Sequence, residues 1–326
     1  GRTIKYSWLL LIGSLLFSQN MINRLKVPVI IKGKMGFGYD NNFLRLSEKE
    51  IREDDVTEYG ISSTLDSPIL KPTVKLIYSP AIIDGKTTNI ITSVSYSHFT
   101  QADQKSYLIS NVSMEMKLRS YSWIKVGIRD IPKYYLRDYH DRDLSNVDYY
   151  NCTFSSQGYF ASYSLPIKRL HRTWMKVYVD YTKEYYNSHF TEFDLNIIAI
   201  GIKLSSKDYK NYPIQINFIQ SFANNVTFQN GLHSTRDMNR GYSQRFFSFK
   251  LSKNNMALTI IQELGVLFSN TYRKYSSEIE SDVLHYNRNQ NESKINVWIG
   301  GDLNHSTGLR LDLINRSRDT FSVEKW

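Results

Sequence analysis

Residues 29–46 alternate between apolar and polar positions. One set of alternate residues is apolar and ends in aromatic rings: Val29, Ile31, Gly33, Met35, Phe37 and Tyr39. The other set begins with Ile30 and is otherwise basic, small or polar: Lys32, Lys34, Gly36, Gly38 and Asp40. A period of two residues is typical of a β-strand. The pattern lasts for about a dozen residues, close to the roughly 9–11 tilted residues with which a strand crosses a bilayer. The stretch therefore predicts the first strand of a membrane β-barrel.

The same alternation recurs along the rest of the chain. Further strands are expected near residues 69–78, 89–100, 107–118, 124–129, 153–165, 175–181, 193–204, 213–218, 244–251, 257–268, 294–303 and 309–313. The fold class is therefore predicted to be all-β, a transmembrane up-and-down antiparallel barrel of about 14 strands, of which 13 are visible. An even number is expected for a bacterial single-chain barrel.

The connections between the predicted strands alternate in length. Long polar connections follow odd-numbered strands, at residues 47–67, 130–151, 224–241 and 269–291, whereas those after even-numbered strands are short. The third and seventh strands are exceptions, since short connections follow both. Outer-membrane barrels have short periplasmic turns and longer extracellular loops. The alternation favours such a barrel over a soluble β-sandwich.

The two termini also carry signals. Residues 1–19 combine basic Arg2 and Lys5 with a short apolar run, residues 8–17, which is typical of a secretory signal peptide. The expected organisation is a signal peptide at 1–19 and a single barrel domain at 20–326. Trp326 is aromatic, but Glu324 and Ser322, in phase with it, are polar. Either the sequence stops just before a closing strand or it closes with a short irregular one.

Composition is compatible with this reading. Hydrophobic residues make up 41% of the chain and mean hydropathy is −0.42, as expected where only alternate residues face lipid. Aromatic residues reach 14%, with 24 Tyr and 5 Trp, which suits the membrane interfaces. The net charge of +10 is spread along the chain rather than concentrated in one patch, so a nucleic-acid partner is not expected. The single cysteine, Cys152, excludes an internal disulfide.

One motif resembles a known group of proteins. The residues GFGYDNNF at 36–43 resemble the first strand of uncharacterised, porin-like bacterial outer-membrane β-barrel proteins, where a glycine-rich strand ends in Gly-Tyr-Asp-x-Asn plus an aromatic residue. The run RSRD at 316–319 resembles the loop before their closing strand. The resemblance implies a barrel exported to the outer membrane of a Gram-negative bacterium. It carries over no catalytic residue and no substrate.

The strand phases assign side chains to two faces. The lipid-facing set is predicted to contain Val29, Ile31, Met35, Phe37, Val74, Leu76, Met114, Met116, Val126, Ile128, Val177, Val179, Phe247, Phe249, Val297, Ile299, Leu311 and Leu313. The basic pore lining is predicted to contain Lys32, Lys34, Lys71, Lys75, Lys117, Lys125, Arg129, Lys176, Lys250, Lys294 and Arg310. The acids expected opposite them are fewer: Glu115, Asp180, Asp302 and Asp312. Rings of Lys and Arg favour anions. The alternative is a filled lumen in which these charges pair.

Other chemistry is weakly represented. His140 beside Asp141, or His233 beside Ser234, could join a hydrolytic set, but neighbours on a strand point to opposite faces and no nucleophile-elbow motif is present. The acidic stretch from Glu48 to Glu58 lacks the spacing of a calcium loop. No catalytic residue, metal site or cofactor is predicted, and the protein is not expected to be an enzyme.

The expected function is passive diffusion of small solutes through an outer-membrane barrel, with anions favoured. The alternative is a closed or plugged barrel acting as a structural, adhesion or secretion-assisting surface protein, with the connection at residues 47–67 as the candidate plug. A soluble exported β-sandwich is a third hypothesis. Expected partners are outer-membrane lipids and lipopolysaccharide, the barrel-assembly machinery and small solutes. The sequence leaves the oligomeric state open.

Overall fold

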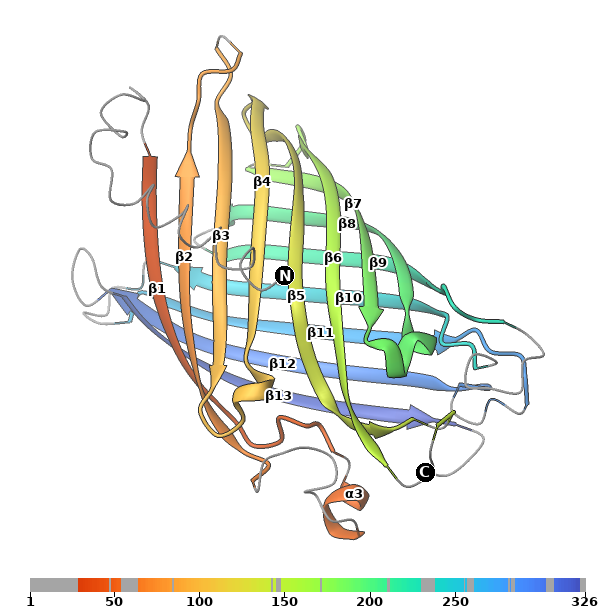
Figure 1. Cartoon of the computed structure of the whole chain (residues 1–326). Coiled ribbons are helices and arrows are strands. Elements are labelled where there is room, and N and C mark those ends of the chain that lie inside the picture. Colours follow the sequence, from red (N-terminus) through yellow and green to blue (C-terminus); the bar gives the residue numbers. More distant parts are fainter. Residues whose placement is uncertain are drawn as a thin grey trace.

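The computed structural model has an all-β fold, a single antiparallel sheet that rolls into a barrel-like wall (Figure 1). The structure describes residues 29–46, 48–53, 64–83, 85–141, 143–144, 148–170, 172–209, 212–229, 238–254, 256, 261–280, 282, 285–302 and 308–322. The predicted signal peptide lies outside these residues.

Thirteen strands form the sheet. They are β1 (Val29–Asp40), β2 (Ser67–Tyr78), β3 (Thr88–Phe99), β4 (Tyr107–Arg119), β5 (Ser122–His140), β6 (Tyr149–Pro166), β7 (Thr173–Tyr186), β8 (Leu195–Tyr209), β9 (Tyr212–Asn225), β10 (Tyr242–Asn254), β11 (Glu263–Tyr275), β12 (Asn289–Asp302) and β13 (Gly308–Phe321). Short helical turns occur at α3 (Glu48–Glu53), η3 (Asp103–Lys105) and η4 (Ser188–Phe193). Within the described ranges, no helix is both long enough and apolar enough to cross a membrane.

The strand order follows the sequence, β1 to β13, and every neighbouring pair is antiparallel. Figure 1 shows the sheet curling so that β8–β13 pass behind β1–β6. The two edges are β1 and β13. Because strand direction alternates along the sheet, these two odd-numbered strands run the same way. The up-and-down topology and the thirteen visible strands are confirmed, and no fourteenth strand occurs in the described part of the chain.

The polar segment 130–151 is a correction to the sequence prediction. It was expected to be a long loop, but β5 continues to His140 and β6 begins at Tyr149. The register shifts twice in this hairpin, between Ile131 and Tyr134 and again between Tyr135 and Arg137. A shift of this kind inserts extra residues into one strand and breaks the two-residue period. The alternation pattern therefore disappears although the strand continues.

Other boundaries also differ from the prediction. The first strand is shorter than predicted, since it ends at Asp40 rather than at residue 46, whereas the next two differences are extensions. The expected loop at 269–291 is reduced, because β11 extends to Tyr275 and β12 begins at Asn289. The run at 316–319 is not a loop, since β13 continues through it to Phe321. Strands of a barrel extend past the apolar band into water, where both faces become polar and the sequence signal is lost.

The connections keep part of the predicted alternation. The longest ones, residues 41–66, 226–241 and 276–288, follow the odd-numbered strands β1, β9 and β11. Only residues 120–121 separate β4 from β5, and only 210–211 separate β8 from β9. The connection after β5, residues 141–148, is short, contrary to prediction. We call the end of the sheet after odd-numbered strands the loop end, and the other end the short-turn end.

Candidate functional site: the inner wall

The strand register separates two chemically different faces. Residues directly opposite each other on paired strands share a face. Val74, for example, pairs with Gly33 and Val94, and Val177 pairs with Tyr163 and Ile202. Followed across the sheet, these pairings place all eighteen residues of the predicted lipid-facing set on one face and all eleven predicted pore-lining residues on the other.

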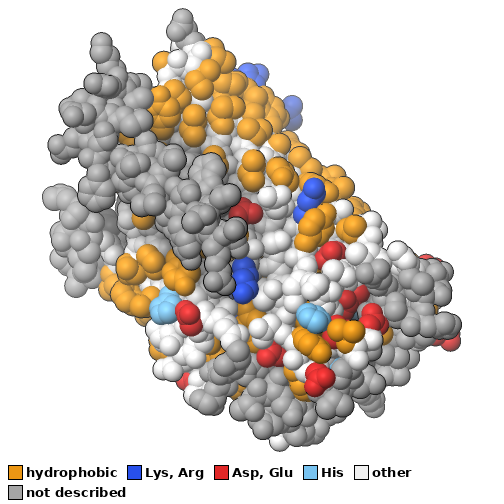
Figure 2. Space-filling view, in the orientation of Figure 1, with side chains coloured by type: hydrophobic (Ala, Val, Ile, Leu, Met, Phe, Trp, Pro, Cys, Tyr) orange, Lys and Arg blue, Asp and Glu red, His pale blue; other side chains and the backbone are white. Residues whose placement is uncertain are grey.

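The apolar face is the outer surface of the curled sheet. In Figure 2 hydrophobic side chains spread over the upper part of this outward surface, and acidic side chains and histidines lie toward the loop end. The outer side chains are highly accessible, with Phe37 80%, Ile200 54% and Val112 49% exposed. Isolated exposed hydrophobic residues are normal in water, but a continuous apolar wall is not.

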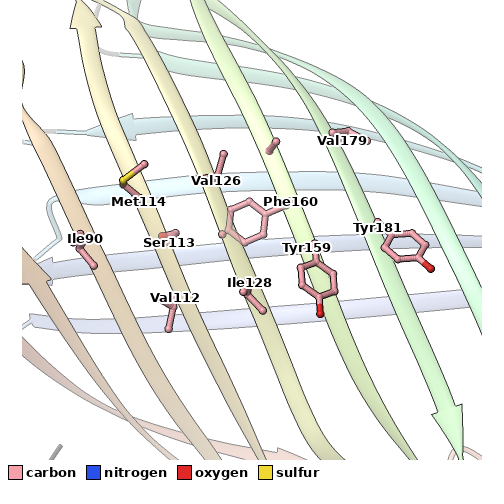
Figure 3. Close-up of a pocket in the computed structure, with 12 residues that line it drawn as sticks. Ile90, Val112, Ser113, Met114, Val126, Ile128, Tyr159, Phe160, Val179 and Tyr181 are labelled. Atoms are coloured by element: carbon pink, nitrogen blue, oxygen red, sulfur yellow. The ribbon is translucent and has the colours of Figure 1, made fainter.

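An open apolar depression lies on this outer wall (Figure 3). Ala161 on β6 sits between Val126 of β5 and Val179 of β7. The taller rings of Tyr159 and Tyr181 lie beside it. Ala161 is among the residues that line the hollow, and the lining is almost entirely apolar. Most of its lining faces outward, and Ser113, Gly127 and Phe160 contribute to it from the inner phase of the same strands.

The inner wall is polar and more tightly packed than the outer one. Apart from Ser122 at the start of β5, the buried serines of the strands all lie on it: Ser67, Ser97, Ser113, Ser164, Ser205, Ser221, Ser248, Ser252 and Ser269. Side chains converge on the concave face of a curved sheet, so small residues fit there. The usual arrangement of a water-soluble protein, with apolar residues inside, is reversed.

Basic side chains form a belt on the inner wall near the short-turn end. We call this the inner basic belt: Lys32, Lys34, Lys75, Lys117, Lys125, Lys176, Lys203, Lys250 and Arg310. Lys71, Arg129 and Lys294 share the face and lie further from that end. Lys203 was missed from the sequence, although its phase against Ile200 and Ile202 could have revealed it.

Some inner charges are paired. Lys125 Nζ lies 3.7 Å from Glu115 Oε2, and Arg129 lies 3.7 Å from Asp180 Oδ2. Arg310 donates to both oxygens of Asp312, each at 2.8 Å. The remaining lysines of the belt have no carboxylate within 4.0 Å among the residues that the structure describes. Among the described residues, the belt therefore has more cations than carboxylates that pair with it.

Aromatic rings lie over glycines on the same wall. Phe160 stands opposite Gly127, Tyr178 opposite Gly201, and Trp298 opposite Gly265. A Cβ atom at Gly127 would come within 2.5 Å of the Phe160 ring, and one at Gly265 within 2.0 Å of Trp298. The missing side chain lets each ring lie flat on the neighbouring strand, an arrangement that also covers the exposed glycine backbone.

The sequence motif at 36–43 covers the end of β1 and the start of a turn at the loop end. Asp40 accepts a hydrogen bond from the Asn42 N–H at 3.0 Å, and the Asn42 side chain bonds both N–H and C=O of Leu46 at 2.9 and 2.8 Å. This closed turn buries Phe43 (2% exposed) against Phe99. Phe99 lies on the inner face. The first connection thus begins by folding inward.

Two further contacts hold this part of the loop end. Glu50 of α3 accepts a hydrogen bond from Arg137 of β5 at 2.9 Å, so the helix is tied to the wall; Figure 1 shows α3 at the loop end. The buried Lys105 ammonium donates to the carbonyl oxygens of Tyr135 and Leu136 at 2.9 and 2.8 Å. Burial lowers the pKa of Lys105 to about 7.

A second group of buried residues surrounds η4 and the last long connections. Phe190 is fully buried, and the adjacent Glu192 is 7% exposed. Burial raises the pKa of Glu192 to about 7, and nearby Asp143 and Asp141 add to the effect. Further along, His285 Nδ1 lies 2.9 Å from Asp282, and burial lowers the pKa of this histidine.

The histidine hypotheses from the sequence are not supported by this geometry. Asp141 bonds His189 at 3.0 Å rather than its neighbour His140. His233 and Ser234 lie outside the described residues. Cys152 is fully buried, so it is not an exposed thiol. Among the described residues, no group of three or more His, Cys, Asp or Glu side chains is arranged to hold a metal ion.

Comparison with solved structures finds a structural similarity at low sequence identity. No protein-family model and no curated protein sequence matches the chain. The crystal structure of Pseudomonas aeruginosa OccK10 (OpdN) is similar over 92% of this chain and 99% of that chain, with 6% sequence identity and a TM-score of 0.34.

Proposed function

We propose that this protein is an outer-membrane β-barrel channel through which small solutes diffuse passively, with anions favoured. The observation that carries the proposal is the segregation of faces over all thirteen strands. The exposed apolar outer wall needs lipid around it, because a continuous apolar surface of this extent is unfavourable in water. Closed antiparallel sheets with apolar exteriors and polar interiors are the β-structures that span outer membranes.

The anion preference follows from the inner basic belt. Lys32, Lys34 and Lys75 come together on β1 and β2, where Lys32 and Lys75 stand directly opposite each other. Like charges at this distance repel unless water or anions lie between them. A wall with more cations than acids lowers the energy of an anion in the lumen and raises that of a cation. On this proposal, lipids and lipopolysaccharide contact the outer wall, and the assembly machinery inserts the exported chain.

Conductance in a planar bilayer tests the proposal. The full chain is refolded, and folding is checked by the change in gel mobility on heating. Discrete current steps with a reversal potential of the anion-selective sign, under a salt gradient, are expected. Cation-selective steps would overturn the anion preference. Absence of steps from a protein that is demonstrably folded and inserted would overturn the channel itself.

The second candidate is a closed barrel that acts as a structural, adhesion or secretion-assisting surface protein. The inward turn at residues 41–46 and the Glu50–Arg137 contact favour it. A variant lacking residues 48–53 discriminates between the two. If the wild type is silent and this variant conducts, the first connection closes the barrel. If both conduct with similar step size, the first connection is not a plug.

A further inference from the structure

Three lysines of the inner basic belt lie on β7, β8 and β10, and no carboxylate of the described residues comes within 4.0 Å of them. Lys176 on β7 stands directly opposite Lys203 on β8. Their charges act on one another, and those of Lys125 and Lys250 extend the interaction on either side. Glu115, the acid that acts on Lys176, pairs with Lys125 instead. We call Lys176, Lys203 and Lys250 the lysine ladder.

Neighbouring side chains hold the ladder in place. The Tyr178 hydroxyl donates to Asn217 Oδ1 at 2.8 Å, and Asn217 stands opposite Lys203. The Lys176 ammonium lies 5.7 Å from the Tyr178 ring. This ring packs over Gly201, two residues before Lys203. The lysines therefore rise from a surface whose aromatic and amide groups are themselves fixed.

The far end of the ladder is built around a buried tryptophan. Lys250 Nζ lies 4.7 Å from the Trp298 ring centroid, and Arg310 lies at the same distance from it. The Trp298 indole N–H donates to Glu263 at 2.8 Å. Arg310 is held by Asp312 at 2.8 Å. Glu263 therefore bonds Trp298 and Asp312 pairs with Arg310, and Lys250 is not paired with either acid.

We propose that the lysine ladder binds a small multivalent oxyanion, a molecule with at least two phosphoryl or carboxylate charges, on the inner wall. Adjacent ammonium groups without acids repel, so the state that bridges them with one polyvalent anion is favoured over the empty state. Ammonium groups act as strong point-charge donors to phosphoryl and carboxylate oxygens. The inference rests on the proposed channel function, because solutes must reach the inner wall.

The test measures binding on the folded full chain in detergent micelles, so it does not require conduction. Pyrophosphate and citrate are the probes for the two classes of oxyanion, and sodium chloride at equal ionic strength is the reference. A ligand that binds only the folded state raises the unfolding temperature, which is followed by the heat-dependent gel shift. Wild-type protein should bind at least one probe about tenfold more tightly than chloride. The probe that binds identifies the oxyanion class.

Matched variants locate the site. The triple substitution Lys176→Gln, Lys203→Gln, Lys250→Gln should lower the affinity for the effective probe about tenfold or more. The control triple Lys86→Gln, Lys168→Gln, Lys274→Gln removes the same charge from exposed positions outside the belt and should retain the affinity within about twofold. If the ladder triple does not fold, Lys203→Gln alone should weaken binding about threefold.

The outcomes separate this inference from the channel proposal. Equal losses in the two triples, or no probe binding in the wild type, would overturn the ladder even if the barrel conducts. Probe binding that depends on the ladder, in a barrel that gives no current, would overturn the channel and keep the site.

Discussion

The most direct test of the two faces is a charge placed on either side of β8. Ile200 lies on the outer wall and is 54% exposed, and its cross-strand neighbours are Val179 and Gln220. Ala199, the residue before it, lies on the inner wall opposite Asp180. Ile200→Arg and Ala199→Arg therefore insert the same charge at adjacent positions on opposite faces.

The two environments predict different magnitudes. An Arg on the lipid face of a barrel costs about 2–4 kcal/mol near the bilayer midplane. In water, a substitution at a half-exposed surface position changes stability by less than about 0.5 kcal/mol. If Ile200 faces lipid, the folded-to-unfolded equilibrium constant of Ile200→Arg should fall by roughly 30-fold or more, since each 1.4 kcal/mol is about a factor of ten. Ala199→Arg should stay close to the wild type, because Asp180 faces the new guanidinium.

Equilibrium unfolding by denaturant in lipid vesicles, followed by heat-dependent gel mobility, measures both variants. Equal stability of Ile200→Arg and Ala199→Arg, within about 0.5 kcal/mol, would contradict the assignment of Ile200 to a lipid-facing wall. A larger loss for Ala199→Arg than for Ile200→Arg would mean that the faces are assigned in reverse.

Three further predictions concern packing and pH. Gly127→Ala places a Cβ 2.5 Å from the Phe160 ring and should cost about 1–3 kcal/mol in the same unfolding assay, whereas Gly33→Ala, with nothing within 4 Å, should be neutral. Phe43→Ala should lower the free energy of unfolding by about 3–5 kcal/mol and speed proteolysis of the first connection. The control Ile51→Ala, at a side chain that is 40% exposed on α3, should have neither effect. Equal proteolysis rates for the two variants would contradict the packing of Phe43. Because the pKa of Glu192 is raised from 4.5 to about 7, the folded state holds this proton more tightly than the unfolded state. The free energy of unfolding should therefore fall as pH rises from about 4.5 to 7. Glu192→Gln should remove the part of this decrease that comes from Glu192. Parallel pH profiles of the free energy of unfolding for the wild type and Glu192→Gln would contradict the raised pKa.

The sequence alone determined the class of fold and the chemistry of its faces. In most of the strands the residues that face outward are mainly apolar and their neighbours along the chain are mainly polar or small, so the two-residue period is visible in the sequence. Strand β4, with Val112, Met114 and Met116 in phase, is an example. Thirteen such stretches give the number of strands. Their order in the sheet also follows from the sequence, because each strand of an up-and-down sheet pairs with the strands before and after it in the chain.

Only the tertiary structure shows the strand extensions, the register between strands and the packing of the connections, because the two-residue period does not specify them. The extended hairpin of β5 and β6 is held by cross-strand pairs such as Tyr134 with Phe154, across two register shifts that erase the alternation. Lys176, Lys203 and Lys250 are brought together by the registers between β7, β8, β9 and β10. The sequence of any one strand does not specify its register with the next strand. The inward turn of Phe43 onto Phe99 joins residues on different strands of the sheet. A period is a local property of one strand, whereas register, stagger and loop packing arise only when strands meet.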